Sequence, residues 1–430
     1  MKKINIVTLG CSKNTYDSEL LIGGLVKNNF KIVNDVVDSD CVIVNTCGFL
    51  DEARQEGVDT ILELENLKNN GKINSLLVMG CMSERFGDDL KQEITNVDKY
   101  FGSNDVSQII KYLCEKEFDQ YDPDFQRSLL TPGHYGYLKI SEGCDNNCSF
   151  CSIPIMRGLQ KSQPIAWNVQ EAQRMANSGV KEILIIAQDS TAYGWDLNPK
   201  ASLADLLKKL NDVKDLEWLR LHYAHPSHLT NKIIDCYKHL DKLVPYIDMP
   251  IQHSSNSMLK DMRRGLKIEG IKRKIDKIKS INSDISIRTS LIVGFPNESD
   301  NDFDDLCDFV KDVRFDRLGV FKYSEEEGTY GKTAFNDNIP NKIKRERFDE
   351  LMKLQMEINL SKNKNLLNSN QKVIIDTQTQ DGKSIGRTYR DSPDIDNTVT
   401  FNERLKVGKF YNARIISASA YNLIGDVNYE

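Results

Sequence analysis

The sequence predicts an α/β protein with three parts: an N-terminal doubly wound parallel sheet, a central partial barrel of six βα units, and a small C-terminal antiparallel β-barrel. Three observations support this fold class. Strand-like and helical stretches alternate over residues 1–115, a second alternating series begins at residue 135, and five short strands separated by Gly, Asp and Asn follow from residue 371. We therefore expect domains at residues 1–115, 134–365 and 368–430.

The N-terminal part alternates apolar strands with helices. The expected strands are 3–9, 41–47, 73–81 and 97–103. The expected helices run from Asp17 to Asn28 and over 51–69 and 84–94, with Asp51 as the N-cap of the second helix. Strands that alternate with helices in this way form a parallel sheet. Residues 115–134 are polar, carry two prolines and show no period, so we expect a linker there.

The central part contains six strand candidates, which are 135–140, 182–188, 217–223, 244–251, 285–295 and 314–323. Helical stretches separate most of them, for example 166–178, 202–213 and 300–312. The long stretch 342–365 is expected to be a helix that leaves the barrel. The strands of the last part are 371–378, 383–389, 398–402, 410–419 and 421–427, and they predict a small β-barrel of the kind that often holds a partner.

Composition limits the class of protein. The chain has 430 residues, of which 40% are hydrophobic and 28% charged, as is ordinary for a globular protein. No run of about eighteen apolar residues occurs, and the start MKKINIVTLGC is expected to be a first strand rather than a signal peptide, so we expect a cytoplasmic protein without a membrane partner. The ten cysteines then indicate metal or redox chemistry rather than disulfides. A net charge of −6 argues against a protein whose main task is to bind nucleic acid.

The segment EGCDNNCSFCSIP holds Cys144, Cys148 and Cys151 in a C-x3-C-x2-C spacing, just beyond the strand 135–140. Three thiolates so close together predict a metal site. Zinc would require a fourth Cys or His nearby, and His134 precedes the strand at the wrong end. Three thiolates on a 4Fe–4S cluster would leave one iron open for a substrate or cofactor.

A second set of cysteines shares one placement at the ends of strands. Cys11 follows the apolar run 3–9 through a glycine, Cys47 closes the run 41–46 just before a glycine, and Cys81 follows the run 73–79 through a glycine. The carboxyl ends of parallel strands lie at one sheet edge, where open α/β sheets bind ligands, so these thiols are expected to converge. The alternative is three unrelated buried thiols, because free cysteine is often found in protein cores.

The C-x3-C-x2-C spacing, with Phe150 before the last cysteine, resembles the radical S-adenosylmethionine (SAM) superfamily. The resemblance implies that the amino and carboxylate groups of SAM chelate the open iron. It also implies that an electron from the cluster cleaves SAM to a radical that abstracts hydrogen from an unactivated carbon. Phe150 is then a candidate cofactor contact.

The strand-end cysteines, the barrel and the terminal β-barrel together resemble the methylthiotransferases, over essentially the whole chain. In that family the terminal barrel is called a TRAM domain. The resemblance implies that Cys11, Cys47 and Cys81 hold an auxiliary 4Fe–4S cluster whose open iron carries or donates sulfur. It also implies that C–H is replaced by C–S–CH3, with one SAM supplying the methyl group and another the radical. An electron donor and a sulfur donor are the implied partners, and the two clusters are expected to face each other across the substrate site.

Two branches of this family differ in substrate. The segment 319–329 (GVFKYSEEEGT) and the segment 386–399 (GRTYRDSPDIDNTV) resemble the RimO-like branch, which modifies the β-carbon of an aspartate in ribosomal protein S-twelve of the small subunit. The MiaB-like branch modifies an adenosine in transfer RNA. Residues 368–430 contain eight Lys/Arg and eight Asp/Glu, and this neutral balance favours a protein target over RNA. An alternative from another class is a non-catalytic zinc-binding adaptor associated with the ribosome.

Further candidates stand at the ends of barrel strands, where α/β barrels carry their active sites. Gln188 and Asp189 close the second strand and are candidate catalytic residues. Gln252 and His253 close the fourth strand and are candidate cofactor contacts. Gly294 is either a close approach to SAM or a turn glycine.

The remaining residues are interpreted as structural. The histidines His222, His225 and His228 are expected to line a cavity without forming a metal site. Four cysteines fit no ligand pattern and are expected to be structural, namely Cys41, Cys114, Cys236 and Cys307. Three positions depart from the family motifs, namely Gln163, His225 and Asn297.

Overall fold

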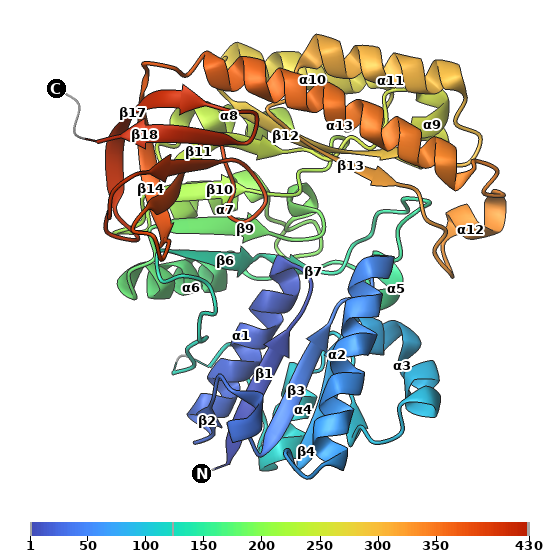
Figure 1. Ribbon diagram of the computed structural model, residues 1–430, viewed down its shortest axis with the longest axis vertical. Coiled ribbons are helices and arrows are strands. Elements are labelled where there is room, and N and C mark those ends of the chain that lie inside the picture. The colour runs from blue at the N-terminus through green and yellow to red at the C-terminus, as the bar shows by residue number, and fades with distance from the viewer. Residues whose placement is uncertain (1, 123, 428–430) are drawn as a thin grey trace. The chain divides into compact units, whose positions relative to one another are not determined.

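The computed structural model describes residues 2–122 and 124–427, which form two compact units (Figure 1). The first unit comprises Met1–Thr131, Tyr137–Asp145 and Ser152–Lys161, and the second comprises Pro132–Gly136, Asn146–Cys151 and Ser162–Glu430. Met1 of the predicted N-terminal domain, Pro123 of the predicted linker and residues 428–430 of the predicted terminal barrel lie outside the described residues.

The first unit contains the predicted doubly wound parallel sheet, in the strand order β2-β1-β3-β4-β5. Its strands are β1 (Lys3–Thr8), β2 (Lys31–Ile32), β3 (Cys41–Thr46), β4 (Ser75–Gly80) and β5 (Lys99–Tyr100). Its helices are α1 (Ser12–Lys27), α2 (Asp51–Asn69), α3 (Cys81–Glu93), α4 (Val106–Cys114) and α5 (Ile153–Arg157), with a 3-10 turn at Val36–Asp38. β1, β3 and β4 are adjacent, so the segments that follow them start at the same sheet edge.

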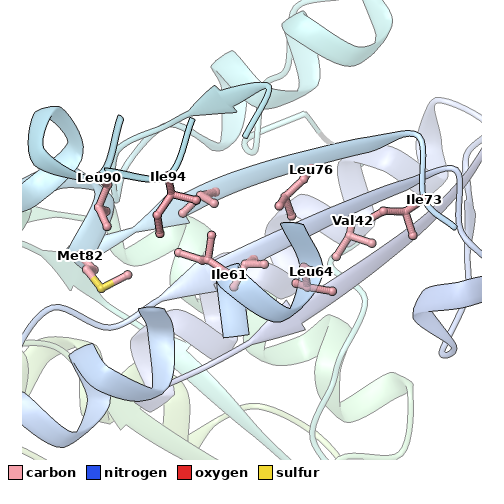
Figure 2. Packing of buried hydrophobic residues seen from close by; sticks show 10 residues of the cluster. Val42, Ile61, Leu64, Ile73, Leu76, Met82, Leu90 and Ile94 are labelled. Atoms are coloured by element: carbon pink, nitrogen blue, oxygen red, sulfur yellow. The ribbon is translucent and has the colours of Figure 1, made fainter. Parts of the chain in front are cut away.

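Helices cover both faces of this sheet. Figure 2 shows one face, where Ile61 and Leu64 of α2 pack with Leu76 of β4 and Leu90 of α3 in a fully apolar cluster. On the other face the Asn45 amide of β3 donates to the Asn14 carbonyl and the Ser18 hydroxyl of α1. Side chains of β3 point alternately to the two faces of the sheet, and every residue of β3 is buried, because helices cover both faces.

Two helices begin earlier than expected. α1 begins at Ser12 rather than Asp17, and α3 begins at Cys81 rather than Glu84. The first turns of α1 bury polar side chains, among them Asn14 and Asp17, so the apolar period that predicts a helix is missing there. The predicted N-cap Asp51 is wrong, because Leu50 is the N-cap and Asp51 is already helical. α4 was not predicted.

The predicted linker contains no helix or strand among its described residues, but it packs on the first unit. Phe125 is 2% exposed. Arg127 forms a buried ion pair of 2.5 Å with Glu19 of α1, and the Leu130 amide donates to the same carboxylate. The described residues of this connection up to Thr131 are therefore part of the first unit.

The central sheet has six strands in the order β13-β12-β11-β10-β9-β6, and each neighbouring pair from β9 to β13 is parallel. The strands are β6 (Tyr135–Lys139), β9 (Glu182–Ile186), β10 (Trp218–Leu221), β11 (Leu243–Asp248), β12 (Ser286–Val293) and β13 (Arg317–Lys322). The helices are α6 (Ile165–Asn177), α7 (Leu203–Asn211), α8 (Asn231–His239), α9 (Asn256–Asp261), α10 (Ile268–Ile281), α11 (Asp300–Val313), α12 (Tyr330–Ala334) and α13 (Asn341–Lys364), with a 3-10 turn at Ser190–Ala192. The short strands β7 (Ser141–Glu142) and β8 (Lys161–Ser162) pair with each other. This open series of six strands confirms the predicted partial barrel.

The C-terminal strands close into a barrel in the order β14-β15-β16-β18-β17. They are β14 (Asn370–Gln378), β15 (Ser384–Thr388), β16 (Thr398–Phe401), β17 (Phe410–Ala418) and β18 (Asn422–Asp426). The predicted antiparallel barrel is correct except at one seam, where β16 and β18 are parallel. Strand direction cannot alternate all the way around a closed ring of five strands, so at least one pair must be parallel. Val373, Val399 and Phe401 belong to its apolar interior.

The terminal barrel is joined to the central strands inside the second unit, near labels β9 to β11 in Figure 1. Asp391 pairs with Arg317 at the start of β13, and Asp396 lies 3.4 Å from Arg288 of β12 and accepts from the Tyr246 hydroxyl. The segment 386–399, which contains the family motif P-x-I-D, therefore packs the terminal barrel against the central strands. No helix within the described residues has the length and apolar character of a membrane span.

Candidate active site

The three strand-end cysteines lie on three adjacent turns of the first unit. Cys11 is the N-cap of α1, Cys47 directly follows β3, and Cys81 is the first residue of α3. Cys11 is exposed and the other two are buried. Burial raises the pKa of the Cys81 thiol to about 11, and both partner thiols add to this rise while Arg157 opposes it. The charges of the two partner thiols therefore act on Cys81.

Two glycines allow these turns to approach so closely. Gly10 has φ +89°, and a Cβ atom there would lie 2.5 Å from the Cβ of Cys47. A Cβ at Gly48 would lie 2.8 Å from the backbone of Cys81. Both distances are below van der Waals contact, so only glycine fits. Gly10 and Gly48 are therefore required by the close approach of the cysteine turns.

A buried charge network surrounds Cys81, and sequence reasoning missed it. The Arg157 Nε–H donates to the Cys81 sulfur at 3.2 Å, and Arg157 Nη2 donates to the Asn14 side chain at 2.7 Å. Arg157 Nη1 donates to Asp17 at 2.8 Å and to Glu142 at 3.2 Å. Although burial raises the pKa of Glu142, Lys139 and Arg157 hold it at about 2. The sequence signals for this network are a lysine at the end of β6, a glutamate three residues later, and an arginine just after the cysteine loop.

The C-x3-C-x2-C loop runs between β7 and α5 without helix or strand. In the first unit the Cys144 amide donates to the Gly158 carbonyl at 3.1 Å. In the second unit the Cys151 amide donates to the Cys148 carbonyl at 3.1 Å, and Arg264 Nη1 donates to the Cys148 sulfur at 2.9 Å. None of the ten cysteines forms a disulfide, so no candidate ligand is tied to another cysteine.

Asp189 lies just past the end of β9 and is 2% exposed. Its carboxylate accepts from the His228 ring at 2.6 Å, the Asn146 amide at 2.8 Å and the Thr191 amide at 3.0 Å. Burial raises the pKa of Asp189, but the His228 hydrogen bond leads the effects that lower it to about 2. Asp189 is therefore a fixed carboxylate that holds its neighbours in place. Gln188 precedes it in the same turn and is half-buried.

The histidines near Asp189 gather more closely than expected. One ligand atom each of Asp189, His225 and His228 lies within 4.8 Å of the others, and His222 does not belong to this group. The expectation that the three histidines form no metal site stays a prediction. Two contacts oppose an ion there. The His225 Nδ1 accepts from the Ser227 amide, and His228 is already bonded to Asp189. Burial and Arg264 lower the pKa of His225 to about 3, so its ring is neutral.

We expect the Asp189 carboxylate to stabilise the protein only above its folded-state pKa. Because this pKa falls from 3.8 to about 2 on folding, its contribution of about 2 kcal/mol is present above about pH 4 and is lost as the pH falls toward 2. The destabilisation by Asp189→Asn should be about 1 kcal/mol smaller at pH 3 than at pH 5, measured by urea unfolding of the metal-free protein. Asp304→Asn, at an exposed position of α11, is the control and should show no such difference. Equal pH dependence in both variants would contradict this assignment.

The other candidate cofactor residues have defined structural contacts. His253 is fully buried, its Nδ1 accepts from the Ser254 and Ser255 amides, and its Nε2 lies 3.1 Å from Glu298. Gln252 has φ +79° and bridges to β12 through its backbone. These contacts shape the end of β11.

Two more candidates lie near the same strand ends. Gly294 has φ +71°, and a Cβ there would lie 2.3 Å from the Lys344 side chain, so its nearest neighbour is this lysine of α13. Phe150 packs beside an apolar cluster that contains Met262, Phe295 and Tyr323. A cofactor role for any of these residues stays a prediction.

Three parts of the chain match known protein families. Residues 3–102 match the model of the uncharacterized protein family UPF0004, residues 138–310 match the radical SAM superfamily, and residues 369–427 match the TRAM domain. The open βα sheet and the cysteine loop at its first strand thus define the class as radical SAM enzymes.

Relatives that match over the full length assign the chain to one family within this class. The chain is 42% identical to a protein of Flavobacterium johnsoniae, over 99% of this chain and 98% of that protein. It is 40% identical to a protein of Clostridioides difficile over 100% of both chains. Both relatives are named "Ribosomal protein uS12 methylthiotransferase RimO". The chain belongs to the RimO family, which confirms the resemblance inferred from its motifs.

Solved structures support the fold. The chain is similar to the radical SAM methyltransferase TsrM from Kitasatospora setae, with a TM-score of 0.56 and 13% identity over 77% of each chain. It is also similar to the cobalamin-dependent radical SAM enzyme OxsB, with a TM-score of 0.54 and 14% identity over 83% of this chain and 56% of that one. At these identities the likeness concerns the fold alone.

Proposed function

We propose that this protein transfers a methylthio group to ribosomal protein uS12, converting the C–H bond at the β-carbon of an aspartate into C–SCH3. One observation carries the proposal. Three cysteines from three adjacent strand ends converge in a chain that also has a C-x3-C-x2-C loop, so two separate sets of three thiols are available. Full-length similarity to proteins named as uS12 methylthiotransferases supports the substrate.

We infer that each cysteine set holds one 4Fe–4S cluster, with SAM at the cluster of Cys144, Cys148 and Cys151. The donor chemistry fits, because iron–sulfur clusters are held by thiolates and each set supplies three. An arginine donates a hydrogen bond to one sulfur in each set, as expected where a thiolate rather than a thiol must be stabilised. When bound, the clusters and SAM would supply hydrogen abstraction and the transferable sulfur and methyl group.

The protein's own residues would fix geometry around these groups. Asp189 holds Asn146 of the cysteine loop and His228 at fixed positions, and Arg264 ties Cys148 to the Pro250 carbonyl at the end of β11. Phe150 anchors the loop by packing against the apolar cluster that contains Met262 and Phe295. We expect an electron donor and a sulfur donor as further partners, and a cytoplasmic location where ribosomes and reduced thiols coexist.

Transfer RNA methylthiolation is the rival activity. An RNA-binding barrel should present excess positive charge, because phosphate contacts dominate such affinity. The terminal segment 368–430 instead has eight basic and eight acidic residues. Arg387 and Asp391 are each 1% exposed and engaged in ion pairs, so neither contributes to an outer RNA-binding face. This balance favours the ribosomal protein.

The deciding test is an anaerobic assay of the reconstituted protein with SAM, reductant and sulfide. Ribosomal protein uS12, small subunits and unmodified transfer RNA are supplied in separate reactions and followed by mass spectrometry. A methylthio mass gain on an aspartate peptide is expected. A gain on adenosine would overturn the substrate while leaving the cluster assignment intact, and stoichiometric zinc in place of iron and sulfide would overturn the enzyme itself.

A further inference from the structure

Arg157 is a buried charged side chain beside the strand-end cysteines, and its hydrogen bonds leave it one fixed orientation. It is 3% exposed, and all three guanidinium nitrogens have partners. Nη1 donates to Asp17 and Glu142, and Nη2 donates to Asn14. Because these bonds fix the plane of the guanidinium, the remaining Nε–H is directed at the Cys81 sulfur, 3.2 Å away.

The charges around Arg157 balance only while the arginine is present. Lys139 and Arg157 are two cations, and Asp17 and Glu142 are two carboxylates, so the buried group is neutral. Removing the arginine would leave one uncompensated negative charge beside Cys81. A negative charge and the loss of a hydrogen bond to sulfur both disfavour addition of an electron to a neighbouring cluster.

We propose that Arg157 is a positioning residue that raises the reduction potential of the cluster held by Cys11, Cys47 and Cys81. The inference rests on the proposed function, because it requires a cluster at these three cysteines. It goes further by assigning control of that cluster to one residue from outside the N-terminal sheet. Arg157 lies 76 residues from Cys81 in sequence, just after the C-x3-C-x2-C loop.

The second unit offers a matched arginine. Arg264 is 5% exposed and donates to the Cys148 sulfur at 2.9 Å, so it relates to the other cysteine set as Arg157 relates to this one. Each set therefore has one buried arginine bonded to one sulfur. If hydrogen bonding to sulfur acts locally, each arginine should control its own cluster and not the other.

The test uses the full chain with Cys144, Cys148 and Cys151 replaced by alanine, which leaves one cluster to observe. Its midpoint potential is measured by potentiometric titration followed by electron paramagnetic resonance. Arg157→Gln is expected to lower the ratio of reduced to oxidised cluster at least tenfold at a fixed potential, a shift of about 59 mV for one electron. Arg157→Lys, which keeps the charge but not the Nε–H, should shift it less, and Arg264→Gln should leave it unchanged.

The outcomes separate this inference from the proposed function. If the background protein binds no iron and sulfide, the second cluster and this inference both fail. If the cluster forms but Arg157→Gln leaves its potential unchanged, or Arg264→Gln shifts it equally, only this inference fails. The double variant Arg157→Gln/Asp17→Asn restores charge balance and covers the case in which Arg157→Gln alone does not fold. The double variant should keep the part of the potential shift that comes from the lost hydrogen bond. A midpoint potential equal to that of the background protein would overturn the inference.

Discussion

Replacing Cys11, Cys47 and Cys81 together by alanine is expected to abolish methylthio transfer, with product below detection. Cleavage of SAM to 5′-deoxyadenosine should continue, because Cys144, Cys148 and Cys151 belong to a separate loop. The reason is chemical: the thiols at the sheet edge are the only ligands for sulfur-carrying iron in our assignment, whereas none of them contributes to the other set. Alanine leaves the strands of the sheet intact, since all three positions follow strand ends.

The measurement combines metal analysis with mass spectrometry of both products. The triple variant should retain about half of the wild-type iron and acid-labile sulfide, as expected if two equal clusters are held by independent sets. Cys41, Cys236 and Cys307 provide the matched control, because they are buried thiols outside both sets. Their triple replacement should keep the full iron content. Retention of all iron by the first variant, or loss of SAM cleavage together with transfer, would contradict the assignment of two independent clusters.

Replacing Arg220 by methionine is expected to destabilise the second unit by about 3–5 kcal/mol. Arg220 and Glu182 are both fully buried, and the Arg220 Nε donates to the Glu182 carboxylate at 2.6 Å. Burial raises the pKa of Glu182, but Arg220 and then Arg387 lower it below the ordinary value, so the buried group is ionised. Arg220 also donates to the Tyr389 carbonyl at 2.6 Å, which would lose its partner.

The positions of the tryptophans allow this loss of stability to be measured for the second unit alone. All three tryptophans, Trp167, Trp195 and Trp218, belong to the second unit, so tryptophan fluorescence during urea unfolding reports its free energy of unfolding. Lys311→Met breaks an exposed ion pair on α11 and should cost under about 1 kcal/mol. Replacing Arg220, Glu182 and Arg387 together by apolar residues should cost less than Arg220→Met alone, because no buried charge of the triad remains. A larger loss in the triple variant would show that the ion pairs themselves provide the stability.

Sequence alone determined the parts of this protein that depend on local pattern. Alternating apolar runs give the strands, and parallel strands share one carboxyl edge, so the convergence of Cys11, Cys47 and Cys81 could be predicted before any contact was known. The cysteine loop could be recognised in the same way, because its three cysteines lie within ten residues and need no tertiary information. The start of α1 could not, since its first turns bury Asn14 and Asp17 instead of apolar residues.

Only the tertiary structure decided which charges meet. Arg157 and Cys81 are 76 residues apart, and Arg220 and Glu182 are 38 apart, so no local period connects either pair. Asp391 and Asp396 contribute to the neutral charge balance of residues 368–430. Their side chains are nevertheless each 2% exposed, and they face Arg317 and Arg288 of the central strands. The physical reason is that a buried charge is tolerated only beside a partner, and the partner's identity depends on how distant segments pack. Periodicity describes which side of an element is buried, but packing between elements decides what each buried group touches.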